Sequence, residues 1–159
     1  MIVKLHKKHQ LNTRYGKVEE QLRKFKERNI LNVRKAIIKI RTEKLPDPDK
    51  IGNAGSFFKN PVVSMDYFNT LKNDFSTIPS FPVSDELVKI PAAWLIEQCG
   101  WKGYRDRDAG VYPKQSLVLV NYGNANGEDI YNLSERIRKS VVKKFKINLE
   151  REVTVIGNQ

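Results

Sequence analysis

The stretch SLVLVNYGNANGEDIYNLSERIRKSVVKKFK, residues 116–146, decides the fold class. Its first five residues, 116–120, form an apolar run that predicts a strand. Residues 128–146 predict a long amphipathic helix, because apolar side chains recur at helical spacing and lysines gather at the C-terminal end, where the helix dipole favours cations. The apolar stripe consists of Ile130, Leu133, Ile137, Val141 and Phe145. A strand beside such a helix, without a repeating βαβ unit along the chain, predicts an α+β fold.

Working outward, four further helices are expected. They cover residues 17–28, 32–43, 65–73 and the apolar stretch that begins at Pro91. The helix over 32–43 has Asn32 as its expected N-cap and Pro46 as its stop. Its apolar stripe consists of Val33, Ala36, Ile37 and Ile40.

The remaining segments predict short strands and loops. Strands are expected over 2–5 and 153–156. The segment Gly52–Ser56 is expected to be a loop because it contains two glycines, and residues 76–84 are expected to be a loop broken by prolines. Residues 45–49, Leu-Pro-Asp-Pro-Asp, form a rigid connector and a plausible domain boundary.

The composition is that of a globular domain, with 159 residues, 40% hydrophobic and 30% charged. No apolar run approaches the roughly 20 residues that a membrane span needs, and no secretory signal opens the chain. We therefore expect a cytoplasmic protein without membrane contact. The single cysteine, Cys99, excludes an internal disulfide, and with only His6 and His9 it cannot complete a zinc cluster.

The net charge of +11 is concentrated at the two ends of the chain. Residues 1–50 carry a charge of +9, residues 51–100 carry −2 and residues 101–159 carry +4. Basic flanks are able to bind phosphates, which makes a non-catalytic nucleotide- or nucleic-acid-binding module the alternative interpretation. Single-strand binding also needs aromatic side chains among the basic ones, and the basic helix over 32–43 has none, so nucleic acid is not the favoured partner.

Residues 52–61 are the densest candidate for chemistry. The two glycines allow close approach of a ligand, and Ser56 follows them, with Lys59 and Asn60 just beyond. A tight turn that leads into a buried Phe57–Phe58 pair explains this pattern equally well. The sequence contains no P-loop, no Gly-x-Gly-x-x-Gly and no Gly-x-Ser-x-Gly motif.

Four motifs occur in an order that resembles one known family. They are Leu45-Pro-Asp-Pro48, Gly52-Asn-Ala-Gly-Ser-Phe-Phe-Lys-Asn-Pro61, Ala93-Trp-Leu-Ile-Glu-Gln-Cys-Gly100 and Leu149-Glu-x-Glu-Val-x-x-Ile-Gly157. The chain resembles the C-terminal half of UDP-N-acetylenolpyruvoylglucosamine reductase, a flavoenzyme of peptidoglycan precursor synthesis. The proline-broken loop at 76–84 is similar to that of the longer-loop subtype.

The resemblance implies an oxidoreductase that uses FAD and NADPH and reduces the enolpyruvyl ether of UDP-N-acetylglucosamine to UDP-N-acetylmuramate. Its catalytic residues would be Ser56, the proton donor, and Glu152, the partner carboxyl. The substrate-binding positions would be Lys44, Asn60, Gln115 and Phe81, and Arg41 would lie near the flavin. From the residues alone, a capping amide at Gln115 and a solvent-facing carboxylate at Glu152 are the commoner explanations.

The same resemblance divides the chain into three parts. Residues 1–45 would be the tail of a flavin-binding domain, 46–147 the substrate-binding domain, and 148–159 a strand that returns to the N-terminal part. By this resemblance, the flavin-binding half would lie before residue 1, so we expect the isolated chain to be inactive and not to retain FAD, with that half as its partner and a UDP-sugar as its ligand. Thr154 replaces a usual arginine and Phe81 a usual tyrosine, and a scaffold with a decayed site stays a third interpretation.

Overall fold

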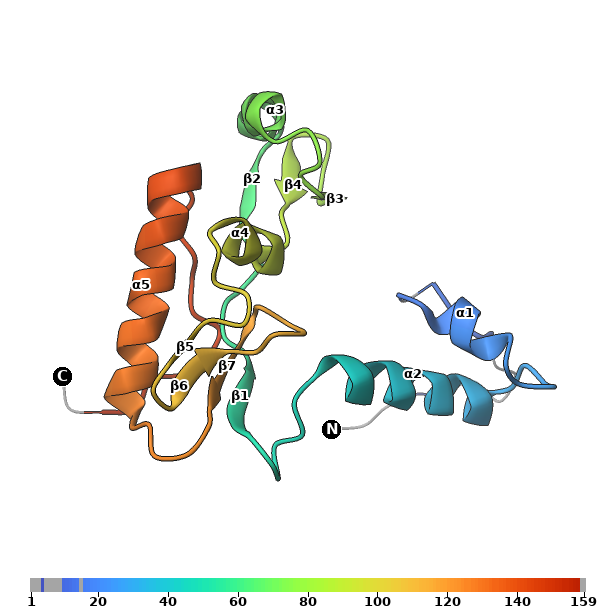
Figure 1. Cartoon of the computed structure of the whole chain (residues 1–159). Coiled ribbons are helices and arrows are strands. Elements are labelled where there is room, and N and C mark those ends of the chain that lie inside the picture. The colour runs from blue at the N-terminus through green and yellow to red at the C-terminus, as the bar shows by residue number, and fades with distance from the viewer. Residues whose placement is uncertain (1–3, 5–9, 15, 158–159) are drawn as a thin grey trace. The chain divides into compact units, whose positions relative to one another are not determined.

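The structure, a computed structural model, describes residues 4, 10–14 and 16–157 (Figure 1). The chain divides into two compact units after Leu45, at the proline-containing connector. The strand expected over 2–5 lies outside the described residues apart from Lys4. The assignment of these parts to the domains of a longer protein stays a prediction.

The N-terminal unit contains two helices, α1 (Val18–Leu22) and α2 (Ile30–Lys44). The expected stripe of α2 is confirmed, because it packs on buried residues of α1. The cluster consists of Val18, Leu22 and Ala36, with Phe25, Val33, Ile37 and Ile40 at its edge. The helix expected over 17–28 is shorter than predicted, because regular helix covers only Val18–Leu22.

The predicted N-cap of α2 is also wrong. Asn29, not Asn32, caps the helix, and its side chain accepts a hydrogen bond from the Asn32 N–H at 2.9 Å. The first turn holds Ile30 and Leu31, which are exposed, so the buried stripe that revealed the helix begins one turn after the cap.

The second unit contains a four-stranded antiparallel sheet. Its strands are β1 (Gly52–Ser56), β5 (Arg105–Asp106), β6 (Ala109–Val111) and β7 (Val118–Asn121), in the order β1-β7-β6-β5. The loop expected at Gly52–Ser56 is thus wrong, because these residues pair with β7. The strand expected over 116–120 exists but begins at Val118.

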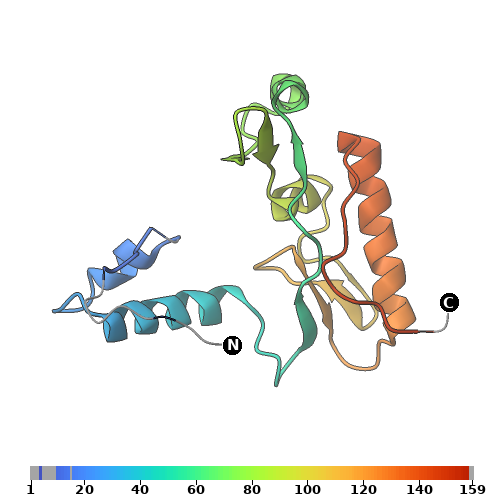
Figure 2. The same cartoon turned by 180° about the vertical axis from the view of Figure 1, so that it is seen from behind.

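Helix α5 (Gly127–Phe145) packs against one face of this sheet (Figure 2). A capping box begins it: the side chains of Asn126 and Asp129 each accept a hydrogen bond from the other residue's N–H, both at 2.9 Å. The predicted stripe is confirmed, since Leu133, Ile137, Val141 and Phe145 are buried in the core and Ile130 packs against it.

A second, three-stranded antiparallel sheet and two helices complete the unit. The strands are β2 (Val62–Ser64), β3 (Phe81–Pro82) and β4 (Leu87–Lys89), in the order β2-β4-β3, and the helices are α3 (Met65–Asp74) and α4 (Ala92–Gln98). The two helices confirm the predictions for 65–73 and for the stretch after Pro91. The loop expected over 76–84 is interrupted by β3.

The strand expected over 153–156 does not form. Arg151 makes a single β-bridge with Phe58, and the chain continues without regular structure. Val155 and Ile156 are 57% and 94% exposed, so their β-type pattern has no sheet to join within this unit. The combination of helices and antiparallel sheets confirms the α+β class. Among the described residues no helix is long and apolar enough to cross a membrane.

The core predicts a clear difference between two positions of α5. Ile137 is fully buried, whereas Val142 is 40% exposed. We expect Ile137→Ala to lower the free energy of unfolding by roughly 2–5 kcal/mol, because it leaves a cavity, and Val142→Ala to change it by less than about 1 kcal/mol. Urea unfolding followed by tryptophan fluorescence measures both, since Trp94 and Trp101 lie in this unit. Equal losses for the two variants would contradict the packing described here.

Candidate functional site

Strand β1 carries one extra residue directly before Ser56. Asn53 pairs with Val120 of β7 and Ser56 pairs with Val118, so three steps along β1 match two along β7. Gly55 has a φ of +74°, a left-handed backbone conformation that glycine adopts without strain. Because of this bulge, Ser56 shares the sheet face of Val118; regular pairing would turn it toward the face that packs on α5.

The segment after Ser56 pairs with the C-terminal segment of the chain. Two backbone hydrogen bonds of 2.9 Å, from the Lys59 N–H to the Glu150 carbonyl and from the Glu152 N–H to the Phe57 carbonyl, form one antiparallel bridge between Phe58 and Arg151. Glu152 is therefore hydrogen-bonded to the residue next to Ser56. The fold brings these two predicted residues into one neighbourhood although they are far apart in sequence.

A polar cavity of about 630 Å³ lies beside this pairing. It is lined by Lys59, Asn60, Pro61, Val62, Lys89, Asn148, Glu150 and Glu152. Two of the predicted site residues, Asn60 and Glu152, meet there. Ser56 is exposed and is not part of the lining, from which it is separated by Phe57 and Phe58.

The two lysines of the cavity differ in their partners. Lys59 donates a hydrogen bond to the Glu150 carboxylate, and this bond, with the charge of the same carboxylate, raises the pKa of Lys59. Lys89 is exposed, and among the described residues it forms no ion pair. The cavity thus presents an ammonium group that is able to bind an anionic group of a ligand.

Asn60 links the cavity to helix α4. Its side-chain oxygen accepts a hydrogen bond of 2.9 Å from the N–H of Ala92, the first residue of that helix. Pro91, at the N-cap position, provides no side-chain cap of its own. Because the oxygen of Asn60 is engaged, its NH₂ group is the part that is able to donate to a ligand.

The three-stranded sheet presents a row of side chains on the face of the cavity. Lys89 of β4 pairs with Val62 on one side and with Phe81 on the other. Directly paired residues of an antiparallel sheet point to the same face, so Phe81, which is 59% exposed, shares the face of two cavity-lining residues. Lys89 did not emerge from the sequence, because its role depends on strand pairing, and a three-residue strand gives too short an alternating pattern to be recognised.

Gln115 lies in the turn before β7. Its N–H donates to the Tyr112 carbonyl at 3.2 Å, and its carbonyl accepts from the Val118 N–H at 3.0 Å. Val118 is the strand partner of Ser56, so Gln115 belongs to the same end of β1. It does not line the polar cavity described above.

Two predicted residues belong to the other unit. Arg41 and Lys44 lie in the last turn of α2, and both are exposed. The carbonyl of Arg41 accepts a hydrogen bond from the Leu45 N–H at 2.8 Å, which ends the helix. Their suggested roles toward a flavin and a substrate stay predictions.

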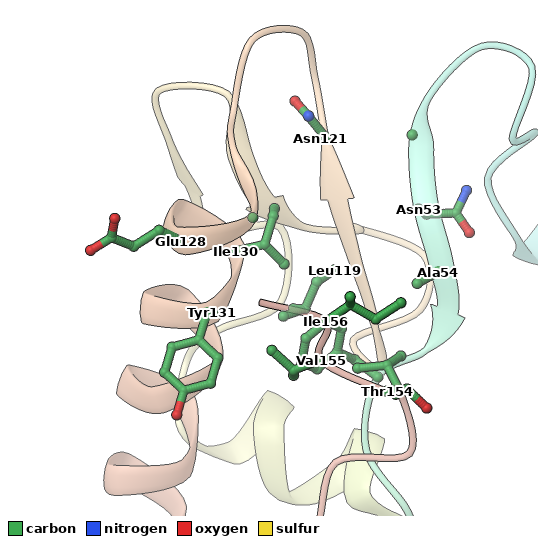
Figure 3. A pocket seen from close by; sticks show the side chains of 14 residues that line it. Asn53, Ala54, Leu119, Asn121, Glu128, Ile130, Tyr131, Thr154, Val155 and Ile156 are labelled. Carbon is green, nitrogen blue, oxygen red and sulfur yellow. The ribbon is translucent and has the colours of Figure 1, made fainter. Parts of the chain in front are cut away.

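A second cavity, of about 700 Å³, is mostly apolar. It lies between β1, β7, the N-terminal part of α5 and residues 153–156. Figure 3 shows Leu119, Val155 and Ile156 close together inside it, while the Glu128 carboxylate points away. It contains no cluster of polar groups comparable to that around Asn60 and Glu152.

The described residues do not fit a flavin diphosphate. Such a group needs backbone N–H donors in a glycine-rich loop. The glycine-rich segment here is strand β1, which pairs with β7, and two N–H groups at its end are in use: Gly55 donates to the Asn53 side chain at 3.1 Å, and Phe57, just after the strand, donates to the Leu117 carbonyl at 2.7 Å. Nor do the described residues contain three His, Cys, Asp or Glu side chains grouped as metal ligands. Burial raises the pKa of the Cys99 thiol, which disfavours the reactive thiolate.

Comparison with known proteins identifies the family of the chain. Residues 47–156 match the sequence model of a protein family described as "UDP-N-acetylenolpyruvoylglucosamine reductase, C-terminal domain". Proteins named UDP-N-acetylenolpyruvoylglucosamine reductase from Flavobacterium johnsoniae and Pseudomonas syringae pv. tomato are 47% and 48% identical over 98% and 94% of this chain. The corresponding Porphyromonas gingivalis protein is 55% identical over 79% of it.

The chain spans less than half the length of each of these relatives: 47%, 44% and 37%, respectively. The family match nevertheless covers most of the chain, including the polar cavity and the bulge before Ser56. By its sequence, the chain belongs to the UDP-N-acetylenolpyruvoylglucosamine reductase family and corresponds to its C-terminal part.

Proposed function

We propose that this chain binds the UDP-sugar substrate of a UDP-N-acetylenolpyruvoylglucosamine reductase and supplies the proton for its reduction, in an enzyme of peptidoglycan precursor synthesis located in the cytoplasm. The observation that carries the proposal is the polar cavity, where Asn60 and Glu152 meet beside Ser56. An ammonium group, an amide NH₂ group and carboxyl groups in one cavity suit a ligand that combines phosphates with sugar hydroxyls and an amide.

The reduction adds a hydride and a proton across the carbon–carbon double bond of the enolpyruvyl ether. FAD, reduced by NADPH, would supply the hydride from outside the residues described here. Hydride addition leaves negative charge on the carbon next to the carboxylate, as an enolate. We propose that the Ser56 hydroxyl gives its proton to that carbon and that Glu152, in its protonated form, donates a hydrogen bond to the enolate oxygen.

The bulge at Gly55 supports the role of Ser56. The hydroxyl lies on an exposed strand end, within a backbone that is tied on one side to β7 and on the other to residues 150–152. A proton donor must be held within hydrogen-bond reach of the reacting carbon, and a paired backbone provides that order better than an open loop. Asn60, Gln115, Phe81 and Lys44 are proposed as substrate contacts and Arg41 as a neighbour of the flavin, as the family resemblance suggests.

Two substitutions of Asn60 distinguish the hydrogen bond that its oxygen accepts from the Ala92 N–H from the one that its NH₂ group is proposed to donate to the ligand. Asn60→Ala removes both the cap of α4 and the donor, so we expect a loss of about 1 kcal/mol in unfolding free energy together with weaker binding of UDP-N-acetylglucosamine. Asn60→Asp keeps the acceptor for the Ala92 N–H but replaces the donor by a charge that repels a diphosphate. We therefore expect near-wild-type stability and at least roughly tenfold weaker binding.

Calorimetric titration and thermal unfolding measure these two quantities. Asn132→Asp is the matched control, because it introduces the same charge on an exposed position of α5 and should leave binding unchanged. Equal affinities for wild type and Asn60→Asp would contradict the proposed site.

A short DNA duplex tests the alternative of a nucleic-acid-binding module. We expect UDP-N-acetylglucosamine to bind at moderate salt and the duplex to bind more weakly, because a cavity of about 630 Å³ has the size of a small-molecule site. Tighter binding of the duplex, with a steep dependence on salt concentration, would favour the alternative.

The flavin part of the proposal predicts a requirement for a second chain. We expect the chain alone to leave gel filtration without bound FAD and not to oxidise NADPH in the presence of the enolpyruvyl substrate. The N-terminal part of the Flavobacterium johnsoniae relative, added in trans, should provide flavin absorbance and substrate-dependent NADPH oxidation. Stoichiometric flavin binding and turnover by this chain alone would overturn the proposal that a second chain has to provide the flavin site.

A further inference from the structure

The segment that carries Glu152 presents alternate residues to opposite sides. Leu149 is fully buried, and the Arg151 side chain is only 16% exposed. Asn148, Glu150 and Glu152 line the polar cavity instead. This alternation is that of an extended chain, so a shift of one residue would turn Glu152 away from the cavity.

Backbone pairing alone holds this segment weakly. Its backbone contacts with residues 57–59 are the two hydrogen bonds of one isolated bridge, both of 2.9 Å, without a continuous strand ladder. The register of Glu152 therefore depends on side-chain contacts as well. Those contacts come from α5.

The guanidinium group of Arg151 makes three contacts with residues of α5. Its Nε donates to the Ser134 hydroxyl at 3.0 Å, its Nη2 donates to the Glu135 carboxylate, and its plane stacks on the Tyr131 ring at 4.2 Å from the centroid. A lysine has neither the planar face nor the second N–H direction, so these contacts are specific to arginine.

Arg138 binds Asn148 and Leu149 of the same segment through its guanidinium group. Its Nε donates to the Leu149 carbonyl at 2.9 Å and its Nη2 to the Asn148 side-chain oxygen at 3.0 Å. Its Nη1 donates to Oε1 of Glu135 at 2.6 Å, and Arg151 donates to that same oxygen. Hydrogen bonds from Arg138 and then Arg151 lower the pKa of Glu135, which keeps the carboxylate charged.

We propose that Glu135 is a positioning residue for Glu152, because it joins the two arginines that fix the register of residues 148–152 on α5. The inference rests on the proposed function in that it assumes a role for the Glu152 carboxyl at the substrate. An isolated surface ion pair contributes little to stability, but here one oxygen ties two arginines that together make four further contacts. The side chains of Glu135, Arg138 and Arg151 are 28%, 26% and 16% exposed.

Amide hydrogen exchange measured by NMR on the whole chain tests this role. The N–H groups of Lys59 and Glu152 report the pairing directly, and those of Ile137 and Val141 report the intact helix. We expect Glu135→Ala to accelerate exchange at the first two by about tenfold or more and to leave the helix amides unchanged. Glu135→Gln retains an acceptor at the Oε1 position and should restore most of the protection.

Glu128→Ala is the matched control, since Glu128 is an exposed glutamate in the first turn of the same helix. It should leave exchange at Lys59 and Glu152 as in wild type. If Glu135→Ala does not fold, Arg151→Lys makes the same comparison, because it keeps the charge and loses the contacts with Ser134 and Glu135.

Unchanged exchange at Lys59 and Glu152 in the substituted chain would overturn the proposal. Acceleration that extends equally to Ile137 and Val141 would also overturn it, because Glu135 would then stabilise the unit as a whole. Titration of the same proteins with UDP-N-acetylglucosamine separates this inference from the proposed function: failure of wild type to bind counts against the function, whereas the exchange result concerns positioning alone.

Discussion

Burial of one face of α5 is the interaction on which the rest of the second unit depends. Phe145, at the end of the helix, packs against the rings of Phe75 and Trp94, and its carbonyl accepts a hydrogen bond of 2.7 Å from the Tyr67 hydroxyl. The same helix covers the four-stranded sheet through its central residues. It therefore joins the four-stranded sheet to α3 and α4.

The site is assembled from segments that are individually ordinary. Four features from distant parts of the sequence form it: the bulge of β1, the amide of Asn60, the row of side chains on the three-stranded sheet, and the extended segment before Glu152. Each has a structural role of its own, such as the cap of α4 by Asn60. Chemistry and folding therefore share the same hydrogen bonds, which explains why loss of function and loss of stability have to be measured separately.

The sequence predicts the α+β class and the main helices because their apolar stripes are long and regular. It misses β1, since two glycines within five residues indicate a loop and the strand exists only through its pairing with β7. It also places a strand at 153–156, where the backbone pairs with no strand among the described residues. The candidate site follows the same rule: Asn60 and Glu152 emerge from motif resemblance, whereas Lys89 and Glu135 depend on contacts that only the folded chain reveals.

The glycine bulge has a consequence for the solubility of the folded unit. In the sheet as described, β1 is an outer strand, and an outer strand with evenly spaced N–H and C=O groups is a template on which other chains add as new strands. The extra residue at Gly55 breaks that spacing and increases the local twist. One residue without a side chain thus orients a serine on one side of the strand and protects its outer edge from aggregation.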